Sequence, residues 1–244
     1  MVRSAASLRS TGLVLFAALL GPGSGATAQE LFDPSLKANL DLPFNAVGER
    51  QDEEAAPERV VFFGQTYEAS AIVWALDESG SMTENGRWEL QTREVTRAIA
   101  ELGEDAEFGV VYYGSRVASF RSATLKAKEA NKSAAIDFVR SRRPSGDTCI
   151  GEGVVKALEI VRKSGSKHRT VIVTSDGRPD NCATGNRANA QEIEQIYQQT
   201  LKANPDRSVI VHTIWVGRSQ DQEAIQFLRK LAQIHGGTFR MVSG

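Results

Sequence analysis

Carboxylate and hydroxyl side chains gather in three short segments of this 244-residue chain. Asp77, Ser79 and Ser81 directly follow the apolar run AIVWAL, and Asp176 comes just after the run TVIVT. Thr148 lies between them, shortly before a helical pattern. Oxygen atoms of this kind are hard ligands that suit Mg²⁺, Mn²⁺ or Ca²⁺ and hold zinc or copper poorly. The five residues therefore offer oxygen ligands of the kind that a hard divalent cation prefers.

The elements that must position these side chains alternate between two patterns. Short β-branched or aromatic runs predict strands, and longer segments with apolar residues at three- and four-residue spacing predict amphipathic helices. The expected strands are Val60–Phe63, Ala71–Leu76, Phe108–Tyr113, Thr170–Thr174, Ser208–Val216 and Thr238–Val242. The expected helices are Arg87–Leu102, Lys132–Arg140, Gly151–Lys163, Ala188–Lys202 and Gln220–Ile234. This alternation predicts a doubly wound α/β fold, in which helices cover both faces of a mostly parallel central sheet.

The order and spacing of the five residues resemble the metal-ion-dependent adhesion site (MIDAS) of von Willebrand factor type A (vWA) domains. Asp77-x-Ser79-x-Ser81 is followed by Thr148 in a Gly-x-Thr loop and by Asp176 in an Asp-Gly-x-Pro turn. The resemblance implies a Rossmann-like vWA fold, in which the strands that end at the two aspartates lie side by side at the centre of the sheet. Doubly wound sheets bind ligands at such a point, beyond the carboxyl ends of the strands.

The resemblance runs from about residue 58 to residue 244 and includes the segment FGVVYYG and the closing LAQIHGGTFRMV. Two positions depart from the family pattern. Asp147 stands where the family often has a second glycine, and Ser175 stands where it often has threonine. Neither change removes a ligand, but Asp147 is expected to place a further acid near the ion.

The resemblance implies that the five residues hold one divalent cation, directly or through water, with Mg²⁺ the best fit and Mn²⁺ or Ca²⁺ as alternatives. Ser79 and Ser81 would bind the ion. Thr148 could switch between direct and water-mediated contact, and Asp176 could contact the ion through a water molecule. Two carboxylates and neutral hydroxyls leave at least one coordination position open. In this family an Asp or Glu of a protein partner takes that position. The expected function is metal-dependent protein binding, in adhesion or complex assembly.

Two other functions compete with this interpretation. One is a structural vWA domain whose ion merely stabilises the fold, and the weaker one is a metal-dependent hydrolase. A serine hydrolase would need Gly-x-Ser-x-Gly, whereas Ser81 is followed by Met82 and no second glycine. A phosphatase with Asp77 as nucleophile would need an acid two positions on, and that position is Ser79. We therefore expect that the protein is not an enzyme.

The first 57 residues differ in character from the rest of the chain. Residues 1–28 have two arginines, a short apolar run and a segment of small residues that ends Ala-Thr-Ala, as at a signal-peptidase cleavage site. This pattern predicts a signal peptide. Residues 29–57 are acidic and lack apolar periodicity, which predicts a flexible leader before a vWA domain at 58–244. We expect an exported protein of bacterial type, periplasmic or secreted, with no membrane span in the mature chain.

The two cysteines lie in loops that the resemblance places on the metal-bearing face. Cys149 directly follows Thr148, and Cys182 comes six residues after Asp176. In an exported protein, an even pair so placed favours a disulfide that joins the two loops. The alternative is two separate small apolar residues, with Cys149 buried at a helix start.

Composition excludes one class of partner. The chain has 29 Lys and Arg against 30 Asp and Glu, for a formal net charge of -1, so nothing favours binding to nucleic acid. The negative charge of the chain is concentrated in the acidic leader, and the predicted signal peptide contributes only two arginines. The remaining residues, which form the domain, are therefore mildly positive. That sign suits a partner that presents an acidic side chain.

Overall fold

The computed structural model describes residues 56–218 and 221–243. The predicted signal peptide at 1–28 and nearly all of the predicted leader at 29–57 lie outside these residues. The described residues all belong to one structural unit.

A seven-stranded sheet forms the centre of this unit, in the order β11-β10-β7-β3-β4-β5, with β6 also paired to β4. The five long strands are mutually parallel, and the two short ones run antiparallel to β4. The predicted, mostly parallel sheet is confirmed, and β3 and β7 are neighbours at its centre. The strands are β3 (Ala71–Asp77), β4 (Glu107–Tyr113), β5 (Val117–Ser119), β6 (Leu125–Lys126), β7 (Arg169–Ser175), β10 (Val209–Val216) and β11 (Phe239–Val242).

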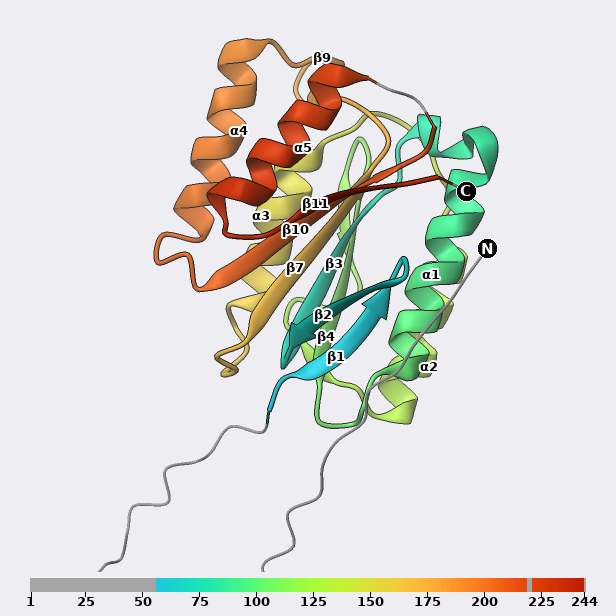
Figure 1. Cartoon of the computed structure of the whole chain (residues 1–244). Helices are drawn as coiled ribbons and strands as arrows, with labels where there is room; N and C mark the ends of the chain where they lie inside the picture. Colours follow the sequence, from blue (N-terminus) through green and yellow to red (C-terminus); the bar gives the residue numbers. More distant parts are fainter. Residues whose placement is uncertain (1–55, 219–220, 244) are drawn as a thin grey trace, which may run out of the picture. The chain divides into compact units, whose positions relative to one another are not determined.

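Five α-helices flank the sheet in the described part of the chain, at the positions that the periodicity predicts. Helices α1 and α2 cover one face, and α3, α4 and α5 cover the other (Figure 1). Within residues 56–218 and 221–243, no helix combines the length and apolarity needed to cross a membrane. The helices are α1 (Arg87–Glu101), α2 (Glu129–Ser141), α3 (Ile150–Val161), α4 (Ala190–Ala203) and α5 (Gln222–Ile234).

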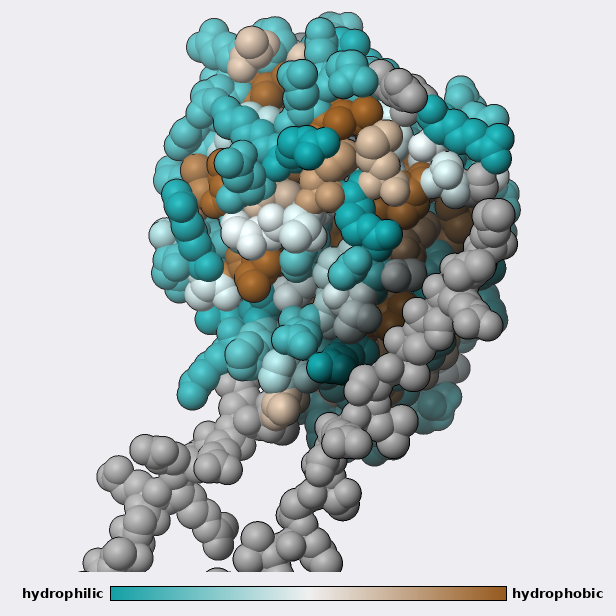
Figure 2. Space-filling view, viewed as in Figure 1, coloured by the Kyte–Doolittle hydropathy of each residue, from teal (hydrophilic) through white to brown (hydrophobic). Residues whose placement is uncertain are grey.

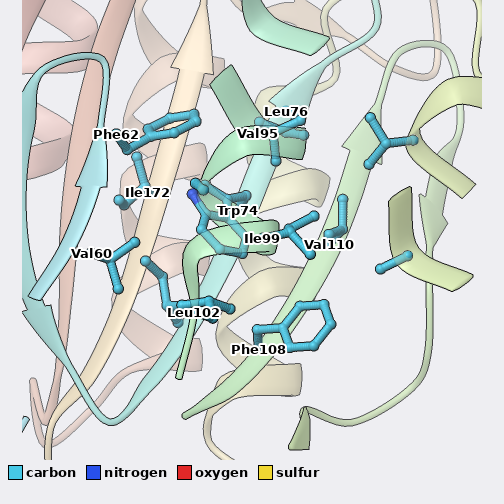
Figure 3. Packing of buried hydrophobic residues seen from close by; sticks show 14 of the residues in the cluster. Val60, Phe62, Trp74, Leu76, Val95, Ile99, Leu102, Phe108, Val110 and Ile172 are labelled. Atoms are coloured by element: carbon cyan, nitrogen blue, oxygen red, sulfur yellow. The ribbon is translucent and has the colours of Figure 1, made fainter. Parts of the chain in front are cut away.

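Strand β3 is buried on both faces because alternate side chains point to opposite sides of the sheet. Ile72, Trp74 and Leu76 pack with α1 and α2, and the intervening small residues pack with α3. Figure 3 shows Trp74 at the centre of the first of these clusters. A strand covered on both faces has no polar side, which explains the unbroken apolar run that precedes Asp77.

The run Val60–Phe63 lies in a strand up to Phe62 and continues into a turn at Phe63, but the strand is not part of the central sheet. It belongs to a two-stranded antiparallel hairpin whose turn includes Gly64 with a φ of +70°. Phe62 is fully buried, with its ring centroid 6.1 Å from that of Trp74. The hairpin therefore closes the α1 side of the core instead of extending the sheet. Its strands are β1 (Glu58–Phe62) and β2 (Gln65–Ala69).

The surface in Figure 2 is mainly hydrophilic, with apolar residues in small separate groups. Among the described residues, the exposed large hydrophobics are Ile210 and Met241, near the sheet edge that ends at β11. Scattered apolar residues of this kind are ordinary on a folded domain.

A close approach between α3 and β4 fixes the start of α3. A Cβ atom on Gly153 would lie 2.5 Å from Cδ1 of Tyr113, so only glycine lets the helix pack this tightly. The Tyr113 hydroxyl in turn donates to the carbonyl oxygen of Thr174, 2.5 Å away. Helix α3 is thus seated on β4 and β7 close to the loop that carries Thr148.

His235 ends α5 in a buried polar cluster. Its Nδ1 lies 3.0 Å from Nδ2 of Asn204, and its Nε2 lies 3.1 Å from Oγ1 of Thr200. The Asn204 amide can only donate through Nδ2, so Nδ1 must accept and the ring must be neutral. Burial lowers the pKa of His235 to about 4.

This cluster predicts a dependence of stability on pH. An unfolded histidine titrates near 6.5, so between about pH 6.5 and 4 the unfolded chain binds more protons than the native one, and stability falls as the pH falls. Between pH 7 and 4.5, we expect the free energy of unfolding to fall by about 2 kcal/mol less in His235→Gln than in the unaltered chain. Urea denaturation at several pH values measures it. The matched control is His168→Gln, at an exposed position; equal slopes in the two variants would contradict the prediction.

Candidate functional site

The two predicted aspartates meet at the carboxyl ends of β3 and β7. Asp77 is the last residue of β3 and is fully buried, and Asp176 directly follows β7. The Ser81 hydroxyl donates to Oδ1 of Asp176 at 2.8 Å. The hydroxyl oxygen of Ser79 lies 3.1 Å from that of Ser81. Four of the five predicted residues therefore form one continuous group of oxygen atoms.

Thr148 reaches the same group from the loop before α3. A Cβ atom on Gly177 would lie 3.6 Å from Oγ1 of Thr148 and 4.0 Å from Oγ of Ser81, so both hydroxyls border the space beside this glycine. Thr148 is only 3% exposed. The structure thus brings all five predicted side chains to one end of the sheet, and we call this set the oxygen cluster: Asp77, Ser79, Ser81, Thr148 and Asp176.

The Asp77 carboxylate is held by two hydrogen bonds in a dry environment. Its Oδ1 accepts the backbone N–H of Ser79 at 2.8 Å, and its Oδ2 accepts the hydroxyl of Ser175 at 2.7 Å. Burial and, to a smaller extent, the nearby charge of Asp176 raise the pKa of Asp77 to about 7, and the hydrogen bonds oppose the rise. Ser175, which departs from the family pattern in the sequence, therefore has a specific structural task.

Arg87 brings a positive charge to the cluster. Its guanidinium forms an ion pair with Asp176, and its Nη1 also donates to the carbonyl oxygen of Ser81 at 3.2 Å. The Arg87 side chain is 8% exposed and that of Asp176 is 0% exposed. This role could not be predicted from the sequence, since a single arginine at the first position of a helix carries no distinguishing pattern.

Gln91 connects α1 to both central strands. Its Nε2 donates to the backbone oxygen of Asp77 at 2.8 Å, and its Oε1 accepts the hydroxyl of Thr174 at 2.5 Å. Gln91 is fully buried. These two hydrogen bonds fix the position of α1, which carries Arg87, relative to the two strands that carry the aspartates at their ends.

The Thr148 loop is fastened to a small hairpin on its other side. The backbone N–H of Thr148 donates to Oδ2 of Asp180 at 2.9 Å, and the backbone N–H of Asp180 donates to the oxygen of Thr148 at 3.1 Å. The predicted disulfide between Cys149 and Cys182 is present and joins the same two segments. Asp180 begins this hairpin, which consists of β8 (Asp180–Asn181) and β9 (Asn186–Arg187).

The further acid expected from Asp147 is engaged elsewhere. Its Oδ2 accepts the hydroxyl of Ser115 at 2.8 Å, and its backbone N–H donates to the same hydroxyl oxygen at 2.9 Å. The neighbouring Gly146 has a φ of +81°, and a Cβ there would lie 2.2 Å from Oγ of Ser115. This turn therefore requires glycine at 146, and it directs Asp147 toward the β4–β5 connection.

The chemistry of the oxygen cluster fits a hard divalent cation. Burial and, to a smaller extent, the charge of Asp176 raise the pKa of Asp77, and three hydroxyls lie close to these two buried carboxylates. No group of three or more His, Cys, Asp or Glu side chains in residues 56–218 and 221–243 is arranged to hold a metal, so hydroxyls would have to complete the ligand set. Mixed carboxylate and hydroxyl oxygens suit Mg²⁺ better than softer ions.

Known sequences match most of the chain at the level of a family. The family model of the von Willebrand factor type A domain matches residues 71–243. Inter-alpha-trypsin inhibitor heavy chain H1 of Mesocricetus auratus is 32% identical over 116 residues, which are 44% of this chain and 12% of that protein. Heavy chain H2 of Mus musculus is 22% identical over 184 residues, 71% of this chain and 18% of that protein. The matched region is therefore a small part of each of these relatives.

Solved structures agree on the fold. A von Willebrand factor type A protein from Catenulispora acidiphila aligns with a TM-score of 0.61 at 21% identity, over 73% of this chain and 40% of that one. The pilus adhesin SpaC of Lactobacillus rhamnosus GG aligns with a TM-score of 0.57 at 16% identity, over 73% and 28%. The vWF domain of a type V pili tip protein from Porphyromonas gingivalis aligns with a TM-score of 0.57 at 12% identity, over 76% and 90%.

The ion pair between Arg87 and Asp176 yields a stability prediction. Arg87→Met keeps the length of the side chain but leaves Asp176 buried beside Asp77 without this counter-charge. We expect the free energy of unfolding in EDTA to fall by about 3 kcal/mol, as is typical when one partner of a buried ion pair is removed. Urea denaturation followed by circular dichroism measures it.

The control is Arg93→Met on the exposed face of the same helix, which should change stability by no more than about 0.5 kcal/mol. Equal effects of the two substitutions would mean that Arg87 acts only through packing of its aliphatic stem.

Proposed function

The chain belongs to the von Willebrand factor type A domain family, and from this we propose that it is a metal-dependent protein-binding domain. Its oxygen cluster would hold one divalent cation, Mg²⁺ in the first place, as a MIDAS does. The cation would in turn bind an Asp or Glu side chain of a protein partner. The process served would be adhesion or the assembly of a complex.

The convergence of the five oxygen-bearing side chains at the ends of β3 and β7 is the observation that carries this proposal. Asp77 and Asp176 are buried and close enough for the charge of one to raise the pKa of the other. A bound cation would relieve that repulsion, and the neutral hydroxyls would leave it enough positive charge to attract a further carboxylate. A domain that does not bind a cation would be more stable with fewer buried charges at the ends of these two strands.

We propose a binding role rather than catalysis because the described site offers no activated nucleophile. The Ser81 hydroxyl donates a hydrogen bond to Asp176, and the buried His235 lies at the end of α5 in a polar cluster of its own. Binding also agrees with the pilus adhesin among the structurally similar proteins. The matched part of the inhibitor heavy chains is too small to transfer the activity of those proteins.

We also propose that the protein is exported, into the periplasm or the medium. The disulfide supports this location, because such bonds persist mainly in oxidising compartments. The predicted signal peptide at residues 1–28 supports it independently.

Calorimetric titration with Mg²⁺ tests the site directly. We expect one site per chain, with affinity reduced about 100-fold by Asp77→Ala and about 10-fold by Ser81→Ala, since each removes an oxygen from the cluster. The control is Ser133→Ala, whose hydroxyl lies on an exposed position of α2, and it should bind as the unaltered chain does. If Mg²⁺, Mn²⁺ and Ca²⁺ all fail to bind, or bind equally to Asp77→Ala, the proposed site is wrong.

Capture of partners from the native host separates binding from the structural alternative. The immobilised chain should retain a protein in Mg²⁺ and release it in EDTA, and Asp77→Ala should not retain it. Capture that persists in EDTA would favour a domain whose ion only stabilises the fold.

A further inference from the structure

A hollow lined by two arginines lies directly beside the oxygen cluster. It has a volume of about 280 Å³, slightly below the range of small-molecule sites and enough for one side chain with its hydration. Glu78, which stands between Asp77 and Ser79 in the chain, forms one wall. The full lining is Glu78, Gly114, Ser115, Arg116, Arg142 and Ser145.

Backbone hydrogen bonds fix this hollow relative to the cluster. The N–H of Glu78 donates to the oxygen of Tyr113 at 2.8 Å, and the oxygen of Glu78 accepts the N–H of Ser145 at 2.7 Å. The N–H of Gly80 donates to the oxygen of Gly146 at 3.0 Å. The loop that carries Ser79 and the walls of the hollow therefore form one connected unit.

Arg142 is held rigidly at the edge of the hollow. Its Nε and Nη2 donate to the two carboxylate oxygens of Glu78, at 2.9 and 2.5 Å. Its guanidinium carbon also lies 5.8 Å from the ring centroid of Tyr112 and 5.7 Å from that of Phe138. This arrangement leaves Nη1 unused by Glu78, on a side chain that has already lost its conformational freedom. Such preorganisation favours binding.

Arg116 brings a second positive charge, which no carboxylate in the described part of the chain neutralises. It lies in the turn between β4 and β5, is exposed, and has no side-chain partner among the described residues. Arg143, next to Arg142, is also exposed and uses its guanidinium on the carbonyl oxygens of Arg140 and Arg142. Two guanidinium groups, those of Arg116 and Arg142, thus line the hollow.

The nearby acids do not cancel this charge. Glu78 is the one acid in the lining as far as the structure describes it, and it is already paired with Arg142. Asp147 approaches from outside the lining, through its hydrogen bond with Ser115. In the lining one carboxylate therefore stands against two guanidinium groups, so the lining carries a net positive charge.

We propose that this hollow is a second anchoring point that takes a second carboxylate of the protein partner, on Arg116 and on Nη1 of Arg142. The inference rests on the proposed function, because the first carboxylate is the one bound by the cation. The partner class is then a segment with two acidic side chains at a fixed separation. Guanidinium groups suit this task because they bind carboxylates with defined geometry.

A library of random dodecapeptides displayed on phage tests the proposal with the full chain immobilised in Mg²⁺ and eluted in EDTA. We expect the recovered peptides to share two acidic positions at a constant spacing. A synthetic peptide with both acids should bind about 10-fold more tightly than its version with the second acid changed to the amide. In Arg116→Gln this ratio should fall to about 1.

Arg93→Gln, with the same change of charge on the exposed face of α1, should keep the ratio near its original value. Mg²⁺ titration of Arg116→Gln should match the unaltered chain, which shows that the variant is folded with its cation site intact. Recovery of peptides with one shared acid, or an unchanged ratio in Arg116→Gln, would overturn the second anchoring point and leave the proposed function standing. A library that yields no EDTA-released peptides would overturn both.

Discussion

Two carboxylates buried side by side impose the constraint on which the surrounding structure depends. Asp77 ends β3 and Asp176 directly follows the adjacent parallel strand β7, so the topology of the sheet brings their charges together. Burial removes the water that would screen these charges. The hydrogen bonds to Asp77 and the guanidinium of Arg87 at Asp176 are responses to that repulsion. Much of the polar detail at this end of the sheet compensates for a pair of like charges.

The compensation extends from the strands to the helices on both faces. Gln91 binds α1 to the end of β3 and to β7, and Gly153 lets α3 settle against β4. The Thr148 loop is fastened to Asp180 and to the segment of Cys182. These contacts join residues that are close in space but far apart in the sequence. The site is therefore held in place by the packing of the core, and not by stiffness of its own loops.

The sequence predicts the fold well because hydrophobic periodicity is a local signal. The apolar runs that end at Asp77 and before Asp176 identify the central strands, and the ends of these strands identify where oxygen-bearing side chains gather. The place of Val60–Phe63 in a separate hairpin could not be predicted, since an apolar run does not say which partner it pairs with. The tasks of Arg87 and Arg142 could not be predicted either, because their acidic partners lie 89 and 64 residues away and no spacing rule connects them.

The disulfide has a consequence for how the domain withstands proteolysis. Cys149 and Cys182 are separated by 33 positions, and the segment between them contains α3 and β7. A single backbone cut anywhere within that segment leaves both fragments covalently attached. Because the two fragments stay linked, the strand before Asp176 remains at a high effective concentration relative to its neighbouring strands. It can therefore stay paired with them instead of being lost by dilution. A nicked molecule can thus keep both halves of the oxygen cluster together.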